Sequence, residues 1–390
     1  MVVTSFDYQK QSCERQGTDV IVQLFEWKWS DIAGECESFL GPNNFCAVQV
    51  SPPNENRIIS NITHIRPWIE RYEPVSYKIQ TRSGNRSEFQ NMIKKCHDAN
   101  IHVYADIVIN HMTDVNHHGY GTGGSVYHGE QRTYPSVPFS GWDFHDKVDC
   151  HTKDLSIQNY SIAEEVRNCQ LQGKADINHK KGYVQDYIVD YLNTLLDLGV
   201  SGFRIADAKY MWPLELKSIF LRLKNVTSFT GGHHRPFIYH EFNEITGESI
   251  DMSEYFSLGR VEYGKYGKDL TSVIRNRELK STYTDWGTTR GMPSPSNLVT
   301  FIDDQTIQRD ISNPVYTHRD RRMYEAVNAF MLAFPYGIPR VFSGYSYSGV
   351  MDGPPHHGDM STIDVKIDSN GNCILGGWKS NYNQPPGWTK

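Results

Sequence analysis

The sequence lacks a long apolar run, an excess of positive charge and closely paired cysteines. A membrane-spanning helix needs about 20 consecutive apolar residues, and because no such stretch occurs we expect no membrane anchor. The 39 Lys and Arg residues are outnumbered by 45 Asp and Glu residues, which is not the basic balance of a nucleic-acid-binding protein. None of the seven cysteines forms a CxxC pair, which disfavours a zinc site of the finger type.

The cysteines that are present indicate an oxidising compartment. They are widely spaced, as in proteins that form disulfides outside the cytosol. Four Asn-x-Ser/Thr sequons, which begin at Asn61, Asn85, Asn159 and Asn225, add weak support for secretion. The first residues, MVVTSFDYQKQ, contain no apolar signal region. Either Met1 replaces a signal peptide or the protein is not secreted, and of these two we predict the first.

Short runs of apolar, β-branched and aromatic residues alternate with helical patterns along the chain. This alternation is typical of a parallel α/β fold. Helical patterns are clear at 87–99, 182–198 and 320–334. The candidate strands lie at 20–27, 47–51, 102–110, 202–208, 237–242, 259–264, 298–304 and 339–345. Eight strands with helices between them predict a (β/α)₈ TIM barrel, whose catalytic face is formed by the C-terminal ends of the strands.

One connection is too long for a barrel loop. Between the third strand and the helix at 182 lie about 70 residues rich in Gly, His, Tyr and Pro, whereas such connections usually have about 2–6 residues. We predict an inserted domain of irregular and β structure at 111–178, which divides the barrel into 1–110 and 179–390. A disordered excursion is the alternative, but Cys150 and Cys169 inside the segment favour a tied, folded unit.

Three segments carry a family resemblance. DIVINH (106–111) places Asp106, Asn110 and His111 at the C-terminal end of a buried strand, on the expected catalytic face. GFRIADAKYMWP and FIYHEF follow in the expected order. With FEW, QVSPPNE, RPWIERYEPVSY and YGIPRV, they make the chain resemble animal α-amylases from about Gln23 onward. The resemblance implies a C-terminal β-sandwich as well, but no helical pattern follows the eighth strand, so we expect the sandwich and the last barrel helix to be absent.

The resemblance assigns three catalytic carboxylates, of which this chain keeps one. A retaining glycosidase needs a carboxylate nucleophile about 5–5.5 Å from a carboxylic acid. The acid maps to Glu241, whereas the nucleophile position holds Ala206 and the transition-state stabiliser position holds Thr306. Gln305 stands where the family has a His before the stabiliser. Because loss of a nucleophile commonly costs several powers of ten in turnover, we predict that glucan hydrolysis is abolished or vestigial.

Neighbouring acids offer an alternative. Asp207 lies one residue beyond Ala206, and Asp303 and Asp304 precede Thr306. Successive side chains on a strand point to opposite faces, so we expect Asp207 to point away from the sugar. A bulge or shift at the strand ends would bring Asp207 and one of the other two acids into place. The protein would then be an active, calcium-dependent, endo-acting α-1,4-glucan hydrolase.

By the same resemblance, part of a glucan-binding surface is kept. The residues that match substrate-binding positions are Trp68, Tyr72, Asp106, His111 and Lys209. Ile69 stands where the family has a second Trp for stacking on sugar rings. We therefore expect an α-glucan or maltooligosaccharide to bind, with weakened affinity. Rim packing is the alternative role for the two aromatic residues.

The resemblance also implies a calcium site. Calcium binds about six to eight oxygens from carboxylates, amides, backbone carbonyls and water. The side-chain ligands map to Asn110 and Asp176, and the backbone carbonyls map to Arg167 and Tyr210. The family has His at position 210, and a backbone ligand tolerates Tyr there. The alternative is that Asp176 is a solvated loop acid.

A chloride lies between two arginines and an asparagine in animal α-amylases. These positions map to Arg204, Arg340 and Asp304. A carboxylate at position 304 would repel chloride and could itself lie between the guanidinium groups as a charge-assisted pair. We therefore expect that the protein does not require chloride, because Asp304 replaces it.

Family spacing also implies disulfides. The implied pairs are Cys36 with Cys96 and Cys150 with Cys169. Cys13 and Cys46 are extra cysteines that could pair with each other. Cys373 would bridge, in the family, to a cysteine just beyond the end of this sequence, and an odd total leaves at least one thiol over.

Three functions follow from these assignments. The leading hypothesis is a calcium-binding α-amylase homologue that binds α-glucan without hydrolysing it, as a binding or decoy protein. The first alternative is the active hydrolase, which predicts starch cleavage that Glu241→Gln abolishes. The second is a secreted structural or interaction protein without sugar affinity. The sequence leaves the oligomeric state open.

Overall fold

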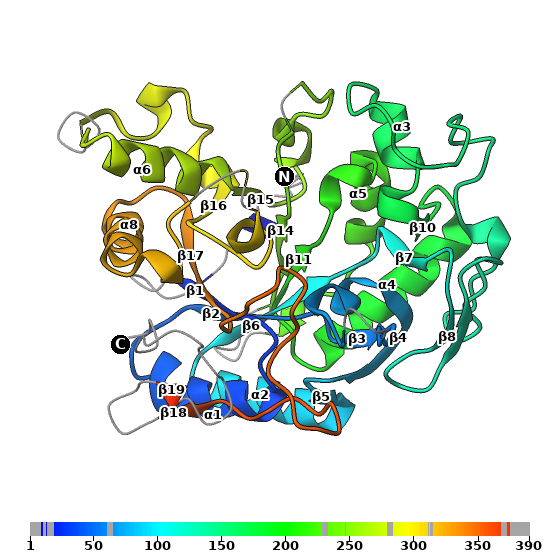
Figure 1. Ribbon diagram of the computed structural model, residues 1–390, viewed down its shortest axis with the longest axis horizontal. Helices are drawn as coiled ribbons and strands as arrows, with labels where there is room; N and C mark the ends of the chain where they lie inside the picture. The colour runs from blue at the N-terminus through cyan, green and yellow to red at the C-terminus, as the bar shows by residue number, and fades with distance from the viewer. Residues whose placement is uncertain are drawn as a thin grey trace.

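The protein is built around a closed barrel of parallel strands, with helices around it (Figure 1). The computed structural model describes residues 9–10, 13, 19–60, 65–227, 233–245, 247–278, 284–310, 312, 315–367 and 373–374. The barrel strands are β1 (Ile21–Leu24), β2 (Ala47–Val50), β6 (His102–Ile107), β11 (Gly202–Ile205), β14 (Phe237–His240), β15 (Arg260–Tyr263), β16 (Leu298–Phe301) and β17 (Ile338–Ser343). Their closed order, β1-β17-β16-β15-β14-β11-β6-β2, confirms the predicted TIM barrel.

Every predicted barrel strand is present, and each ends earlier than the sequence suggests. The strand expected at 202–208 ends at Ile205, and the strand expected at 237–242 ends at His240. Both are buried along their whole length, because helices and the barrel interior cover the two faces of a parallel sheet. The residues that the sequence assigned to the last part of each strand, Ala206 and Glu241 among them, therefore lie in the loops of the catalytic face.

Helices cover the outside of the barrel. They are α1 (Trp29–Glu35), α2 (Arg86–Asp98), α4 (Gly182–Asp197), α5 (Pro213–Leu221), α6 (Lys265–Arg275) and α8 (Arg322–Ala333), whereas α3 (Ala163–Asn168) lies in the segment after β6. The three predicted helices correspond to α2, α4 and α8. Helix α2 begins with a capping box, in which Asn85 accepts from the backbone N–H of Glu88 at 3.0 Å and the Glu88 carboxylate accepts from that of Asn85 at 2.8 Å.

The barrel interior changes from apolar to polar along its axis. Near the N-terminal ends of the strands it is filled by Ile21, Ala47, Tyr104, Phe237, Tyr239, Val299 and Ile338. The change begins at Gln49, whose side-chain oxygen accepts from the Tyr239 hydroxyl at 2.8 Å and from Arg340 at 3.0 Å. Charged side chains lie beyond this point, toward the catalytic face.

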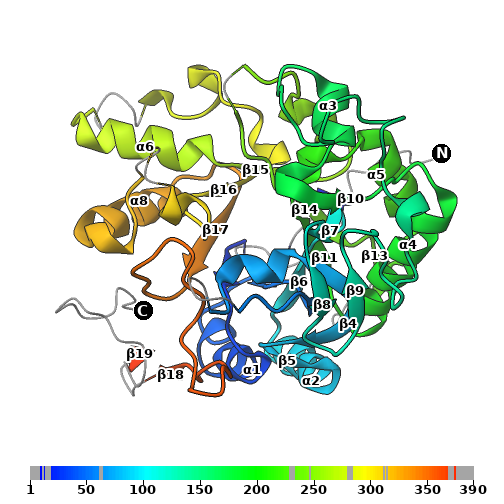
Figure 2. The same ribbon diagram turned by 45° about the vertical axis from the view of Figure 1, so that its right-hand side comes forward.

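Several small sheets lie outside the barrel. The segment after β6 contains β7 (His111–Asp114), β8 (His118–Tyr120), β9 (Val126–His128) and β10 (Lys174–Asp176), together with α3. Figure 2 shows β7, β8, β9 and β10 on the same side as β4, with α3 farther away. The other small strands are β3 (Asn54–Asn56), β4 (Pro74–Thr81), β5 (Gly84–Asn85), β12 (Val226–Thr227), β13 (His233–His234), β18 (Lys366–Ile367) and β19 (Cys373–Ile374). The extra sheets are consistent with an inserted domain, whose boundaries at 111 and 178 stay a prediction.

Three disulfides link the described residues. The bonds Cys36–Cys96 and Cys150–Cys169 confirm the pairs that the family spacing implies. The pair that the sequence left open, Cys13–Cys46, is bonded as well. The side chain of Cys373 and the sequon at Asn61 lie outside the described residues. Within the described part of the chain, no helix is both long and apolar enough to cross a membrane.

Candidate active site

Glu241, the predicted acid, is the first residue after β14. It is 8% exposed and lies at the C-terminal end of the barrel. Its Oε2 accepts a hydrogen bond from the backbone N–H of Asp207 at 3.0 Å. Its Oε1 lies 3.0 Å from a guanidinium nitrogen of Arg204. Glu241 thus combines a cationic partner with a place at the catalytic face.

Glu241 is the outermost member of a buried charge cluster, which we define as Asp106, Arg204, Glu241, Glu262 and Arg340. Arg204 is fully buried and also contacts Asp106 at 3.0 Å and Glu262 at 2.8 Å. The register of β6 and β11 sets Arg204 directly beside Asp106. Arg340, on β17, contacts Glu262 from the other side. One arginine therefore connects the predicted acid to two further buried carboxylates.

The carboxylates of the cluster differ in their preferred protonation state. Burial raises the pKa of Asp106 to about 6, although Arg204 opposes the shift. Burial acts on Glu262 in the same direction, but Arg204 and Arg340 outweigh it, so the pKa of Glu262 lies below its ordinary value. Glu262 is therefore the firmly ionised partner of the two arginines.

Position 206 contributes no reactive group. Ala206 is fully buried, and its backbone N–H donates to Ile107 at 2.9 Å. Asp207 follows with φ +54°, in the left-handed region that non-glycine residues rarely adopt. The expectation that Asp207 points away from the sugar rested on strand alternation and is wrong in its premise, because β11 ends at Ile205. Burial and the nearby Glu241 carboxylate raise the pKa of Asp207 to about 7.

The acids before Thr306 have partners within the protein. Asp303 is 2% exposed and accepts from the Tyr324 hydroxyl at 2.8 Å and from Gln308 at 2.6 Å. Asp304 is 1% exposed and accepts from two backbone N–H groups of the following turn, at 2.9 and 2.7 Å. These contacts argue against either acid moving to a sugar. Thr306 itself offers a hydroxyl and no carboxylate.

Gln305 links the barrel interior to a predicted stacking residue. Its amide nitrogen donates to the Tyr72 hydroxyl at 2.9 Å, and its oxygen accepts from Gln23 at 2.9 Å. The Tyr72 hydroxyl in turn donates to Asp106 at 2.8 Å. Tyr72 is therefore tied to the buried charge cluster through Asp106.

The place expected for Asp304 is taken by Glu262. Asp304 approaches only Arg340, at 3.8 Å, and does not lie between the two arginines. Glu262 contacts both guanidinium groups. Sequence reasoning missed Glu262, and the only available signal was an acidic residue in the middle of a strand that should be buried. With this carboxylate in place, the residues present do not form the site that a chloride needs.

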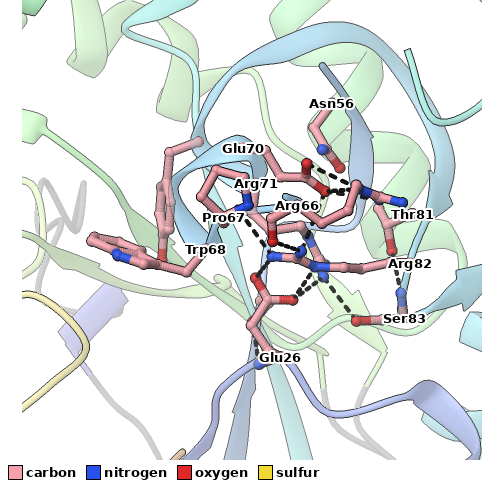
Figure 3. A network of polar contacts seen from close by, with 12 residues as sticks. Glu26, Asn56, Arg66, Pro67, Trp68, Glu70, Arg71, Thr81, Arg82 and Ser83 are labelled. Carbon is pink, nitrogen blue, oxygen red and sulfur yellow. Dashed lines mark hydrogen bonds and ion pairs between the residues drawn. The ribbon is translucent and has the colours of Figure 1, made fainter. Parts of the chain in front are cut away.

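Trp68 begins a 3₁₀ helix, Trp68–Tyr72, that a buried ionic network holds in place (Figure 3). Glu26 accepts from Arg71 at 2.9 Å and from Arg82 at 2.7 Å. Arg82 also donates to the backbone carbonyl two residues before Trp68, at 2.8 Å. Burial raises the pKa of Glu26, but the two arginines outweigh burial and leave it lowered. Sequence reasoning missed this network too.

The predicted stacking pair is in place, and Arg309 shares its surface. The rings of Trp68 and Tyr72 meet edge to face, with centroids 5.9 Å apart. The guanidinium carbon of Arg309 lies 5.2 Å from the Trp68 ring and 4.0 Å from the Tyr347 ring, as in cation–π contacts. The indole N–H donates to the carbonyl of Val350 at 2.9 Å. A sugar that stacks on Trp68 would share the indole with this arginine.

The two other predicted sugar contacts are engaged by the protein. His111 is fully buried, and its Nε2 lies 2.9 Å from the carbonyl of Tyr72. Burial lowers the pKa of His111 to about 3, so the ring is neutral. Lys209 is 1% exposed and contacts Glu248 at 2.8 Å as well as the carbonyl of Asn243. The structure thus places both residues behind the surface of the catalytic face.

The side-chain ligands expected for calcium lie close together, with Asn110 just before β7 and Asp176 in β10, the strand that pairs with β7. Asp176 pairs with His111 in the β7–β10 ladder, and the N–H of Ile177 donates to the carbonyl of Asn110 at 3.0 Å. The side-chain oxygen of Asn110 is buried and accepts no hydrogen bond from any described residue. One carboxylate oxygen of Asp176 contacts His145 at 2.6 Å.

The expected backbone ligands come from the same region. Arg167 is in α3, and this helix contacts the short turn Ala208–Tyr210. In the part of the chain that the structure describes, no three His, Cys, Asp or Glu side chains are grouped to hold a metal ion. A cation between Asn110 and Asp176 would therefore depend on amide and carbonyl oxygens in addition to the single Asp176 carboxylate, and calcium accepts all three kinds of ligand.

Comparisons with known proteins agree with this geometry. A family model described as the alpha-amylase catalytic domain matches residues 68–245. The chain is 47% identical over 378 residues to an alpha-amylase of Pecten maximus, with 94% of this chain and 73% of that protein covered. It is 44% identical over 384 residues to alpha-amylase 1B of Homo sapiens, with 94% and 74% covered.

Solved structures give the same result. The wild-type alpha-amylase I from Eisenia fetida superposes with a TM-score of 0.88 at 37% identity, covering 94% of this chain and 76% of that one. A variant of the same enzyme, solved as a maltohexaose complex, gives the same values. A gamma-CGTase from Alkalophilic bacillus clarkii, with a TM-score of 0.60 at 21% identity, shares the fold alone.

Proposed function

Because the chain belongs to the α-amylase family of glycoside hydrolases, we propose that it binds an α-1,4-glucan and does not hydrolyse it by the family's two-carboxylate mechanism. The observation that carries the proposal is the pair of residues Glu241 and Ala206 at the ends of adjacent strands. Glu241 can donate or accept a proton, but a methyl group cannot attack the anomeric carbon. Thr306 likewise offers no charge to a cationic transition state.

Glucan binding is supported by the surface that remains. The edge-to-face rings of Trp68 and Tyr72 present aromatic surface at the catalytic face, and aromatic rings offer large, rigid contact area for ligands. A relative with the same fold was solved with maltohexaose. We therefore propose maltohexaose as a ligand. A binding or decoy role follows if turnover is absent.

A second candidate function is calcium-dependent hydrolysis by an altered residue set. The specific observation in its favour is Asp207, which is partly exposed and lies beside Glu241. The relatives also favour it, because each is named as an alpha-amylase. In this candidate the Asp207 carboxyl, with a pKa of about 7, would supply the proton. Glu241, held beside Arg204 at 3.0 Å, would be its partner carboxyl group.

Reducing-sugar release from soluble starch separates the two candidates. The wild-type chain is compared with Glu241→Gln and Asp207→Asn at one calcium concentration. No release from any of the three proteins, with a maltohexaose-dependent rise in unfolding temperature, supports a binding protein. Release that both substitutions abolish supports the hydrolase. If maltohexaose changes neither the unfolding temperature nor the Trp fluorescence, the chain is an interaction protein without sugar affinity.

We also propose that calcium joins the inserted segment to the barrel. The residues fit this ion, because the buried Asn110 oxygen accepts no hydrogen bond from any described residue and Asp176 lies on β10, which pairs with the strand that begins after Asn110. The carbonyls of Arg167 and Tyr210 would complete the protein ligands, and the ion would contribute stability. Chelation should lower the unfolding temperature, and calcium should restore it better than magnesium. Asp176→Asn should weaken this response, whereas Asp186→Asn, in a surface pair with Arg222, should not.

An extracellular location completes the proposal. Three disulfides join the described residues, and such bonds persist in oxidising compartments. Expression with a secretory leader should give oxidised, monodisperse protein. Equal yield and stability of protein kept fully reduced would contradict this location.

A further inference from the structure

Glu262 reaches two arginines that come from opposite sides of the barrel. It lies on β15, while Arg204 is on β11 and Arg340 is on β17. Arg204 donates through Nε and Nη2 to the two carboxylate oxygens of Glu262, at 2.8 and 3.0 Å. Arg340 donates to one of the same oxygens. All three residues are no more than 2% exposed, so the bridge is screened from water.

We infer that the carboxylate of Glu262 is a built-in replacement for a bound anion between Arg204 and Arg340. It provides the negative charge that joins the two guanidinium groups, and it is covalently fixed to a barrel strand. Unlike a bound anion, this carboxylate cannot dissociate. The pairing of the two arginines therefore does not depend on the salt in solution. This inference concerns the buried charge cluster and holds whether or not the protein hydrolyses glucan.

The carboxylates around the two guanidinium groups already supply enough negative charge, so a second anion is not needed. The two guanidinium groups lie within 4 Å of four carboxylates, which belong to Asp106, Glu241, Glu262 and Asp304. Negative charge is thus already in excess, and like charges disfavour one another in a buried site. A chloride that entered this site would meet repulsion from every one of these carboxylates that is ionised.

If a further anion could bind to this cluster, it would bind beside Arg340. Its Nη2 and Nε have no hydrogen-bond partner among the described residues. The nearest groups on that side are the carboxylate of Asp304, 3.8 Å from Nη2, and the ring of Phe301, 4.4 Å from the guanidinium carbon. A carboxylate and a π face are both poor neighbours for chloride, so this side of Arg340 does not offer a second site.

Glu262 also acts on Glu241 through Arg204. The bidentate contact fixes the plane of the Arg204 guanidinium group, because a planar fork loses its freedom when two of its donors are engaged. The same guanidinium group then lies 3.0 Å from Glu241. Glu262 is therefore a positioning residue for the acid at the catalytic face, and it does not itself reach the cleft.

The test is an anion titration of the wild-type chain and of Glu262→Gln, which keeps the shape of the side chain and removes its charge. Unfolding temperature is measured in sodium gluconate, with chloride or nitrate replacing gluconate at constant ionic strength. The wild-type chain should show no chloride-specific shift. Glu262→Gln should unfold at lower temperature in gluconate, and chloride or nitrate should raise this temperature by several degrees in a saturable way. A merely structural role would not give such anion-specific rescue.

Asp304→Asn is the matched control. It removes a carboxylate from the same neighbourhood, but from one that approaches only Arg340, so it should not create a response to chloride. A chloride-specific rise in the wild-type chain would overturn the inference, and this titration remains decisive if Glu262→Gln does not fold in gluconate. A folded Glu262→Gln protein that is indifferent to chloride and nitrate would also overturn it, as would rescue confined to Asp304→Asn.

Discussion

The buried charge cluster and the two positions at the strand ends, Ala206 and Thr306, differ in how many ion pairs depend on them. In the cluster, Arg204 contacts Asp106, Glu241 and Glu262 within 3.0 Å. Removing one member would leave a buried charge unpaired, which typically costs about 3–5 kcal/mol. No ion pair depends on Ala206 or Thr306. Catalytic positions can therefore change at little cost in stability, whereas the cluster cannot be dismantled one residue at a time.

The electrostatics of the site sharpen this contrast. A carboxylate at position 206 would lie at the end of the strand beside Glu241, and Asp106 is on the adjacent strand. Like charges so placed raise one another's pKa and oppose folding. An active-site carboxylate is thus a residue that catalysis needs and stability does not. Its absence leaves the barrel intact, and the intact barrel says little about turnover.

The largest expected effect comes from restoring the strand-end charges. In Ala206→Asp/Thr306→Asp, reducing-sugar release from starch should rise by at least about 10³-fold, because a missing nucleophile commonly costs several powers of ten. Ala206→Asn/Thr306→Asn, which adds similar volume without charge, should stay inactive. If the double Asp variant binds maltohexaose and still releases no sugar, the residues at positions 206 and 306 do not by themselves explain the proposed inactivity, and the cover that Arg309 places over Trp68 becomes the next candidate cause.

Breaking the cluster should give the next largest effect, on stability. Arg204→Gln should lower the free energy of unfolding by about 3–5 kcal/mol, because it leaves buried carboxylates without their partner. Urea unfolding measures the change. Lys94→Gln, which breaks the exposed Lys94–Asp98 pair at 2.5 Å, should change it by less than about 1 kcal/mol. If the two substitutions lower the free energy of unfolding equally, the cluster contributes no more to stability than an exposed ion pair does.

The sequence predicts the barrel because its strands are buried on both faces. A run such as LVTF is continuous in apolar or β-forming residues, as burial on both faces requires. The strand ends are less predictable, because alternation assumes that the strand continues. Asp207 shows the failure, since its φ of +54° begins a turn that no periodicity in GFRIADA announces.

The ionic networks are hidden from the sequence for another reason. Glu26 pairs with Arg71 and Arg82, which are 45 and 56 residues away. A glutamate in a strand or loop is usually solvated, and only its three-dimensional neighbours identify it as a buried counter-ion. Glu262 has the same property. The predicted residues that follow motifs, such as Glu241 and Trp68, were found because their local sequence carries the signal.

The network around Glu26 is a second group of buried charges. It tests whether buried ion pairs outside the charge cluster also contribute strongly to stability. Glu26→Gln should lower the free energy of unfolding by about 1.5–3 kcal/mol, the usual range for hydrogen bonds to charged groups. It should also weaken maltohexaose binding, because Arg82 holds the backbone before Trp68. Calorimetric titration measures the affinity. Glu37→Gln, in an exposed pair with Lys95, is the control. If Glu26→Gln binds maltohexaose with unchanged affinity, the network stabilises the fold and has no part in ligand binding.

The smallest expected effect concerns Asp303, a buried acid whose hydrogen-bond donors, Tyr324 and Gln308, are neutral. Burial raises its pKa to about 7, although the hydrogen bonds of Gln308 and Tyr324 oppose the shift. Because the folded pKa lies above the ordinary value of 3.8, its stabilising contribution is complete below about pH 4 and is lost as the pH rises to about 7.

In that window the wild-type chain should lose up to about 1.4 kcal/mol per pH unit relative to Asp303→Asn, since the amide does not ionise. Glu262, with its lowered pKa, should behave in the opposite way, because its contribution fades only when the pH falls below its ordinary value of 4.5. Urea unfolding from pH 3 to pH 8 measures both substitutions, with exposed Asp98→Asn as the control. The free energies of unfolding of Asp303→Asn and of the wild-type chain could instead change in parallel with pH. Neutral donors would then stabilise a buried carboxylate as well as arginines do, and the contrast between the cluster and the strand ends would have no electrostatic basis.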